Sequence, residues 1–283
     1  MTVRGGAIHG GRRDARAMRR KYALTATVVS RTEVAADLFE IVLDCPAIAR
    51  SALPGQFLQV RGWNGCQPLL RRPISIAGTT AGCVVLLIKI VGTGTRLICS
   101  REEGETLELI GPLGNGFPPP ENSARRLLVS GGFGVAPLLF FAAAYDVAGG
   151  KILYGARTGA ELHTGIHGRL GAGWSVVHAT EDGSTGRRGT VIALMEEELA
   201  RDDGWDRVLA CGPGAMLKQA ARCARSHGVR CMVSLEVFMG CGVGACTACA
   251  VPVIDGDRKT YTRACHDGPV FDAEKIVWEE LPF

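Results

Sequence analysis

The sequence contains no uninterrupted run of about 18 apolar residues, the length that a helix needs to cross a membrane. Its longest apolar stretches are Val84–Val91, which Lys89 interrupts, and Val135–Tyr145. We therefore expect no membrane span. Extended disorder is excluded as well, because hydrophobic residues make up 47% and charged residues 21% of the chain, as in ordinary folded proteins. With 283 residues, the chain is long enough for two or three domains.

A basic surface for nucleic acid is also missing. The formal net charge is +4, but residues 1–21 alone carry +6, so the rest of the chain sums to −2. These first residues are rich in arginine and glycine, and we expect a flexible basic tail. No apolar core of a signal peptide follows them, since the segment after Lys21 is typical of a strand. We expect a cytoplasmic protein that binds neither nucleic acid nor a membrane.

Cysteine and glycine, in contrast, are abundant. The chain has 11 cysteines, an odd number that cannot all pair, and 38 glycines, about twice the usual frequency. In a reducing compartment, such a surplus of thiols points to metal or redox chemistry rather than to disulfides.

The pattern of apolar runs divides the chain into a β part, an α/β part and a small C-terminal part. Short apolar runs between turn residues predict an antiparallel barrel over residues 22–120, which ends at Pro118–Pro120. Strands and helices then alternate over residues 121–228, which predicts a Rossmann-like parallel α/β domain. Residues 229–283 form the third domain, whose Gly- and Cys-rich centre suits neither helix nor strand.

The C-terminal part holds four cysteines with the spacing C-x4-C-x2-C-x15-C: Cys241, Cys246, Cys249 and Cys265. A [2Fe–2S] cluster needs four thiolates, and the first two gaps match the plant-type ferredoxin arrangement. Gly242 and Gly244 would allow the loop to wrap closely around a cluster. A structural zinc site is the next alternative, but zinc sites usually carry a C-x2-C pair at both ends. Packed thiols without a metal rarely gather on such a turn. The spacing therefore favours an iron–sulfur cluster.

Two motifs in the barrel could bind phosphate. In Arg71–Ser75, an arginine and a serine hydroxyl flank a proline-restricted backbone, a combination that can hold a pyrophosphate. Gly92–Thr95 offers backbone N–H groups and hydroxyls. Each motif alone is weak, since an arginine pair on a strand is usually only solvated. Together they predict a dinucleotide such as FAD.

Two further motifs lie at strand ends of the α/β part. Ser130–Pro137 follows a buried strand and opens a helix, where exposed N–H groups favour phosphate. It is not G-x-G-x-x-G, so a tight structural turn explains it equally well. Cys211–Pro213 ends a later strand, at the edge where open α/β sheets bind ligands. Its thiol could face a nicotinamide ring or simply be buried.

The order of these motifs resembles the ferredoxin–NADP reductase superfamily and, more closely, the iron–sulfur electron-transfer subunits of NAD-dependent dihydroorotate dehydrogenase. The resemblance covers about residues 22–271. Its most specific segments are Arg72–Ser75, Gly111–Phe117, Ser234–Glu236, Cys241–Cys246 and Cys265–Phe271.

The resemblance also implies a role for individual residues. For FAD it implies Arg72, Pro73, Ile74, Ser75, Leu87, Ile88, Lys89, Gly94 and Thr95. For NAD(H) it implies Gly131, Gly132, Gly134, Cys211, Gly212 and Pro213. For the [2Fe–2S] cluster it implies Cys241, Cys246, Cys249 and Cys265.

The implied function is a relay from NADH through FAD and the cluster to the FMN of a separate catalytic subunit. That subunit would interconvert dihydroorotate and orotate in pyrimidine biosynthesis, in a heterotetramer with two copies of each chain. We find no acid–base pair or orotate pocket in this sequence, so no catalytic residue is assigned. The choice of NADH over NADPH rests on the resemblance, because Arg157 could accept a 2′-phosphate.

Three alternatives remain open. Val237 and Phe238 stand where we expect polar or charged residues, so the same NAD(P)H–FAD–[2Fe–2S] relay could serve a different flavoprotein or a hydrogenase. The chain could also be a stand-alone flavin reductase with a vestigial cluster. A zinc-stabilised, non-enzymatic interaction protein is the third, and its lack of colour would distinguish it.

Overall fold

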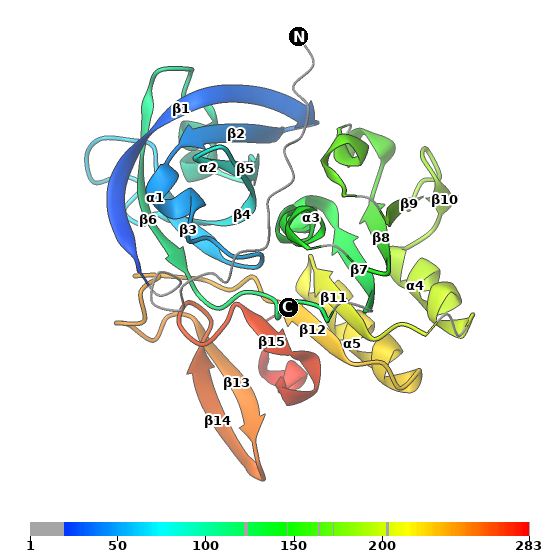
Figure 1. The fold of residues 1–283 in the computed structure, drawn as a ribbon. Coiled ribbons are helices and arrows are strands. Elements are labelled where there is room, and N and C mark those ends of the chain that lie inside the picture. Colours follow the sequence, from blue (N-terminus) through cyan, green and yellow to red (C-terminus); the bar gives the residue numbers. More distant parts are fainter. Residues whose placement is uncertain are drawn as a thin grey trace.

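The computed structural model describes residues 20–121, 124–145, 147–163, 165–171, 173–201 and 204–282. Within these ranges the chain forms a closed antiparallel barrel, a seven-stranded sheet and a two-stranded hairpin. Figure 1 shows the barrel beside the helix-covered sheet, with the hairpin projecting away from both. The predicted combination of a β-barrel and an α/β domain is confirmed. Of the predicted tail, residues 1–19 lie outside the described residues.

The barrel follows the order β1-β2-β5-β4-β3-β6. Its strands are β1 (Tyr22–Ala35), β2 (Leu38–Asp44), β3 (Phe57–Arg61), β4 (Arg72–Thr80), β5 (Cys83–Lys89) and β6 (Thr106–Leu113), and the short helices α1 (Pro46–Ala49) and α2 (Thr93–Cys99) join them. Side chains alternate along β3: Leu58 and Val60 pack in the core of the barrel, so Phe57 and Gln59 point outward. The outer side of β3 is therefore available to the C-terminal segment.

The larger sheet has the order β10-β9-β8-β7-β11-β12-β15. Its strands are β7 (Arg125–Gly131), β8 (Gly149–Ala156), β9 (Trp174–Thr180), β10 (Arg187–Arg188), β11 (Arg207–Cys211), β12 (Cys231–Ser234) and β15 (Val270–Asp272). All neighbours pair in parallel except β12 and β15. Because β15 comes from the C-terminal part and pairs with β12, that part is joined to the sheet by backbone hydrogen bonds.

Helices cover the sheet and connect it to the barrel. They are α3 (Val135–Ala144), α4 (Val191–Ala200) and α5 (Gly214–Ser226), with single 3-10 turns at η2 (Gly132–Gly134), η3 (Gly159–Glu161) and η4 (Ile166–Arg169). Figure 1 shows α3 between the barrel and the sheet, which explains why it is apolar on every side. The amphipathic α5 lies with α4 on the opposite face. None of the helices in the described ranges has the length and apolar character required to cross a membrane.

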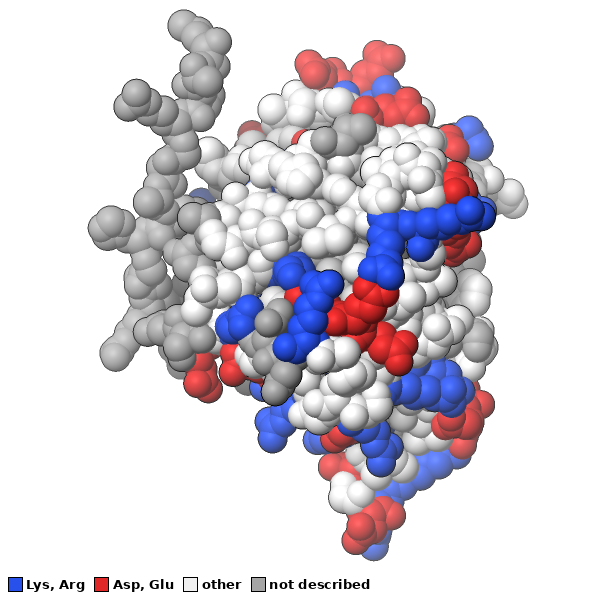
Figure 2. All heavy atoms as spheres, turned by 90° about the vertical axis from the view of Figure 1, so that its right-hand side faces the viewer, with Lys and Arg blue, Asp and Glu red and all other residues white. Residues whose placement is uncertain are grey.

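The C-terminal part consists of a cysteine-rich loop, the hairpin of β13 (Ala250–Asp255) and β14 (Arg258–Arg263), and the 3-10 turns η5 (Ala273–Lys275) and η6 (Trp278–Glu280). The hairpin pairs in continuous register from Ala250↔Arg263 to Asp255↔Arg258. Figure 2 shows acidic and basic side chains interspersed on the face that carries the sheet, without a single large basic area.

Candidate functional site

A pocket of about 190 Å³ lies where the barrel, the sheet and the C-terminal part meet, and we call it the inter-domain pocket. From the barrel it is lined by Arg72, Pro73, Ile74, Ser75, Leu87, Ile88, Lys89 and Thr95, and from the sheet side by Gly134, Cys211 and Gly212. Residues that the sequence assigns to FAD and to NAD(H) are therefore brought to one cavity.

Arg72 is the cation that the first barrel motif supplies to this pocket. Its guanidinium lies over the Trp63 ring, 5.6 Å from the centroid, and donates to the carbonyl of Leu70. Gly94 leaves room for this guanidinium, because a Cβ at that position would lie 2.4 Å from Arg72 Nε and would displace the arginine side chain. Arg71, in contrast, forms an ion pair with Glu108 at 2.6 Å and does not line the pocket.

The Gly92–Thr95 segment forms the start of α2 rather than an open turn. The Thr95 hydroxyl accepts the N–H groups of Val91 (3.0 Å) and Gly92 (3.2 Å) and donates to the Gly92 carbonyl. Its hydrogen bonds are thus used to close the turn, which fixes the backbone next to Arg72.

Three residues on the opposite wall are Cys211, Ser234 and Glu236. Burial raises the pKa of the Cys211 thiol to about 12, so this group is neutral at physiological pH. Burial also raises the pKa of Glu236. The wall therefore presents a neutral thiol and a carboxyl group that is less acidic than usual. Glu236 was not assigned a role from the sequence, although it belongs to a motif of the resemblance.

A second pocket, of about 540 Å³, lies at the carboxyl ends of the parallel strands, and we call it the strand-end pocket. Gly131, Gly132 and Pro213 line it. Gly132 has φ +54° and no atom within 4 Å of an added Cβ, so it leaves open space for a ligand. Gly131 and Gly134 are needed for packing, because a Cβ would lie 2.7 Å from Met216 Sδ and 2.5 Å from the Cys211 carbonyl oxygen, respectively.

The two pockets are adjacent, since Lys89, Val91 and Phe133 line both. Phe133 lies on η2 and is 39% exposed. A dinucleotide bound in the strand-end pocket could therefore extend past this aromatic ring into the inter-domain pocket.

Acidic and basic side chains lie together in the strand-end pocket. Arg157 forms an ion pair with Glu161 at 2.5 Å, and Glu181 lines the same pocket. The hydrogen bond from Arg157 lowers the pKa of Glu161, which keeps this carboxylate charged. Arg157 is therefore already paired. Sequence inspection missed both glutamates, because Glu161 follows β8 and Glu181 follows β9, and only the fold brings the two segments together.

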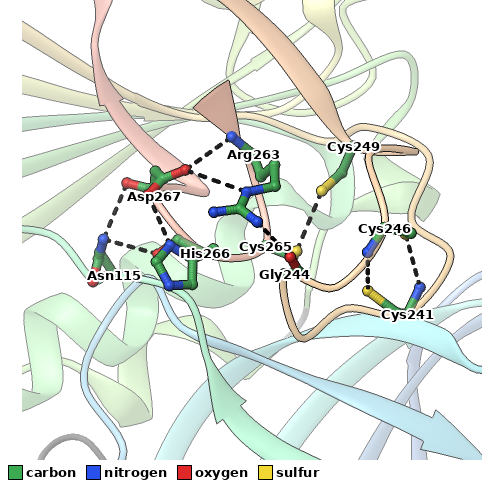
Figure 3. A network of polar contacts seen from close by, with 9 residues as sticks. All are labelled: Asn115, Cys241, Gly244, Cys246, Cys249, Arg263, Cys265, His266 and Asp267. Carbon is green, nitrogen blue, oxygen red and sulfur yellow. Dashed lines mark hydrogen bonds and ion pairs between the residues drawn. The ribbon is translucent and has the colours of Figure 1, made fainter. Parts of the chain in front are cut away.

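Three cysteines of the C-terminal motif, Cys241, Cys246 and Cys249, lie on one loop before β13, and Cys265 follows β14 (Figure 3). They form two pairs. Cys249 Sγ and Cys265 Sγ are 3.3 Å apart, and the sulfurs of Cys241 and Cys246 accept each other's backbone N–H at 3.4 and 3.5 Å. Within the described ranges, no group of three or more His, Cys, Asp or Glu side chains is arranged so that it could hold a single metal ion. Two thiol pairs suit a two-iron cluster better than a single zinc ion.

The environments of the two pairs differ. Burial opposes ionisation of Cys241, but the N–H groups of Cys246, Val243 and Ala245 favour its thiolate and lower its pKa to about 6. Burial and the neighbouring Cys249 raise the pKa of Cys265 to about 12. The loop thus favours the thiolate of Cys241, the form that binds a metal, whereas burial favours the neutral thiol of Cys265.

A polar network holds the segment that carries Cys265 (Figure 3). Arg263 donates to the Gly244 carbonyl at 2.5 Å, and its backbone N–H donates to Asp267 at 3.0 Å. Asn115 of the barrel donates to the carbonyls of His266 (3.2 Å) and Asp267 (3.0 Å). Burial opposes ionisation of Asp267, but the Arg263 N–H and His266 lower its pKa to about 2. The network fixes the cysteine loop against the barrel.

Comparison with known proteins identifies the family. Residues 236–277 match the iron–sulfur cluster binding domain of dihydroorotate dehydrogenase B. The chain is 38% identical to a protein of Desulforamulus reducens that is named dihydroorotate dehydrogenase B (NAD(+)), electron transfer subunit. The alignment spans 264 residues and covers 90% of this chain and 98% of that protein. The chain belongs to the family of dihydroorotate dehydrogenase B electron-transfer subunits.

Solved structures of other proteins have a similar fold. One from work on flavin-based electron bifurcation, of an NADH-dependent reduced ferredoxin–NADP oxidoreductase, matches with a TM-score of 0.79 and 29% identity, over 90% of this chain and 91% of that one. A ferredoxin reductase of carbazole 1,9a-dioxygenase has the same fold, with a TM-score of 0.62 and 24% identity over 74% of this chain and 67% of the other.

Proposed function

We propose that this chain is an oxidoreductase subunit that passes electrons between NAD(H) and the FMN of a catalytic dihydroorotate dehydrogenase subunit, through FAD and a [2Fe–2S] cluster. The observation that carries the proposal is the adjacency of the two pockets and the cysteine loop: Met239, two residues before Cys241, lines the inter-domain pocket. The name shared by relatives that are 35–38% identical supports the dihydroorotate-linked partner.

The residues of the inter-domain pocket fit FAD. Arg72 and Lys89 supply positive charge for a pyrophosphate, and Gly94 leaves the space that Arg72 occupies. The buried side chains of Leu87 and Ile88 give the floor an apolar character. We assign FAD to Arg72, Pro73, Ile74, Ser75, Leu87, Ile88, Lys89, Gly94 and Thr95.

The strand-end pocket fits NAD(H). We assign NAD(H) to residues at the carboxyl ends of β7 and β11: Gly131, Gly132, Gly134, Cys211, Gly212 and Pro213. Gly131, Gly132 and Pro213 line the strand-end pocket, whereas Gly134, Cys211 and Gly212 line the adjoining inter-domain pocket. The open Gly132 allows a phosphate to approach the η2 turn, and Cys211 offers a small neutral thiol beside the ring that exchanges hydride. When bound, FAD takes hydride from NADH and releases electrons singly, and the cluster carries single electrons.

We assign the cluster to Cys241, Cys246, Cys249 and Cys265. The role of the chain is to hold the carriers close together, keep the flavin pocket apolar and tune the sulfur environment. The domain ranges that we propose are 22–120 for FAD, 121–228 for NAD(H) and 229–283 for the cluster, and the pairing of β11 with β12 joins the last two.

The partner is proposed to be an FMN-containing catalytic subunit in a heterotetramer with two copies of each chain. Phe238, 90% exposed and close to the cysteine loop in sequence, offers an apolar contact for such a protein. We also infer a cytoplasmic location, because the described cysteines are all free thiols and a reducing compartment keeps them so.

The experiment that tests the proposal is co-purification with the catalytic subunit, followed by NADH-dependent reduction of orotate. We expect a complex that contains FAD, FMN and iron and that consumes orotate. If NADH reduces the flavin and the cluster but orotate is not consumed, the relay stands and the partner is a different flavoprotein or a hydrogenase. A chain that reduces flavin acceptors rapidly without any partner contradicts the subunit role.

A further inference from the structure

The strongest unexplained feature of the molecule is the side chain of Gln59. This glutamine is 0% exposed, and neither its amide nitrogen nor its amide oxygen has a hydrogen-bond partner among the described residues. A buried amide without partners is costly, and folded proteins rarely keep one. Such a group indicates a partner that binds after folding.

The position of Gln59 identifies which partner that is. Its side chain leaves the barrel on the outer side of β3 and meets the cysteine loop at Gly242, where a Cβ would lie 2.5 Å from both Gln59 Cγ and Nε2. Gly242 has φ +71° and directly follows Cys241, so the amide nitrogen lies against the loop that holds three of the four proposed cluster ligands.

Gln59 also borders the flavin site through the backbone. It pairs in register with Pro73 of β4, and Pro73 lines the inter-domain pocket. One residue thus contacts the proposed cluster loop with its side chain and a proposed FAD residue with its main chain.

We propose that the Gln59 amide donates an N–H hydrogen bond to a sulfur of the cluster on the Cys241–Cys246 side. The inference rests on the proposed function, since it requires a cluster at these cysteines. Donors to cluster sulfurs stabilise the reduced, more negative form and therefore raise the reduction potential. Gln59 is a positioning and tuning residue that makes the cluster a better acceptor for flavin electrons.

The test is a potentiometric titration of the purified chain with its cofactors, followed by EPR spectroscopy of the cluster. Gln59→Met removes the amide with little change in length, and Gln59→Leu replaces it by an apolar side chain without donors. We expect both variants to have a more negative cluster potential than the wild type at equal iron content. We also expect them to lose the magnetic coupling of an exchangeable proton to the cluster.

Gln56→Met is the matched control. Gln56 is a buried glutamine next to the start of β3, but its amide is fully used by the Leu53 N–H and the Gly114 carbonyl, each at 2.8 Å. Its substitution should lower stability and leave the potential unchanged. A shift as large in Gln56→Met as in Gln59→Met overturns the proposal, because packing would then explain both.

Two other outcomes are informative. An unchanged potential in Gln59→Met at wild-type iron content overturns the role of Gln59 and leaves the relay intact. If Gln59→Met does not retain iron, Gln59→Leu decides, and a wild-type potential and proton coupling in Gln59→Leu contradict the hydrogen bond. A wild-type chain that binds no iron contradicts the proposed function itself.

Discussion

At the scale of single residues, the charge balance around Arg157 decides which dinucleotide fits. Arg157 pairs with Glu161 at 2.5 Å, and Glu181 and Lys89 line the same pocket, so a 2′-phosphate would meet two carboxylates beside an arginine that is already paired. A ribose hydroxyl, in contrast, can donate to a carboxylate. The pocket should therefore prefer NAD(H) to NADP(H).

Glu161→Gln should weaken this preference, because it frees Arg157 to bind a 2′-phosphate. We expect the affinity for 2′-phospho-ADP-ribose, relative to that for ADP-ribose, to rise about tenfold. This factor corresponds to the free energy of about one hydrogen bond to a charged group. Calorimetry with both ligands measures the ratio. Glu103→Gln, which removes the same charge from an exposed barrel position, is the control. An unchanged ratio in Glu161→Gln would show that the ion pair does not set specificity.

At the scale of elements, the segment between β8 and β9 connects the sheet to the barrel. The Ala36 N–H donates to the Ala160 carbonyl at 3.0 Å, and Arg169 of η4 pairs with Glu40 of β2. Burial opposes ionisation of Glu40, but His163 and Arg169 outweigh it and lower its pKa below 4.5. The unfolded state therefore binds a proton more readily, so this group contributes stability above pH 4.5 and loses it as the pH falls through the folded pKa.

Glu40→Gln should lower the free energy of unfolding by about 1–3 kcal/mol at pH 7, because it leaves a charged partner without its carboxylate. The difference from the wild type should shrink as the pH falls below 4.5. Urea denaturation followed by circular dichroism at several pH values measures it. A difference that is independent of pH would assign the effect to packing rather than to the ion pair.

Periodicity predicted most elements, because it reflects burial that each segment carries locally. The antiparallel barrel and the parallel, helix-covered sheet that the apolar pattern predicted are both present. The sequence did not predict α2, whose first turn depends on Thr95 closing onto Gly92. It also did not predict the pairing of β15 with β12, since this pairing depends on residues far apart in the chain.

The residues of the candidate site also fall into two groups, those that the sequence identified and those that only the structure shows. Arg72 and the cysteines were identifiable, because their residue types and spacing carry chemistry in the sequence itself. Glu161 and Gln59 were not, because their meaning depends on neighbours from other elements: Arg157 for the first and Gly242 for the second. Ordinary polar residues gain a role only when the fold surrounds them.

At the scale of the whole molecule, the account claims that the barrel, the sheet and the cysteine loop form one continuous electron path. The inter-domain pocket is lined by all three parts, and Gln59 connects the flavin motif to the cysteine loop. This arrangement predicts that NADH alone reduces both carriers within a single chain.

The most direct measurement is an anaerobic NADH titration of the isolated chain, followed by visible and EPR spectroscopy together with iron, sulfide and flavin analysis. The account predicts bound FAD, equal amounts of iron and sulfide, bleaching of the flavin and the EPR signal of a reduced [2Fe–2S] cluster. A colourless, zinc-containing chain, or a flavin that NADH bleaches while the cluster stays oxidised, would contradict the continuous path.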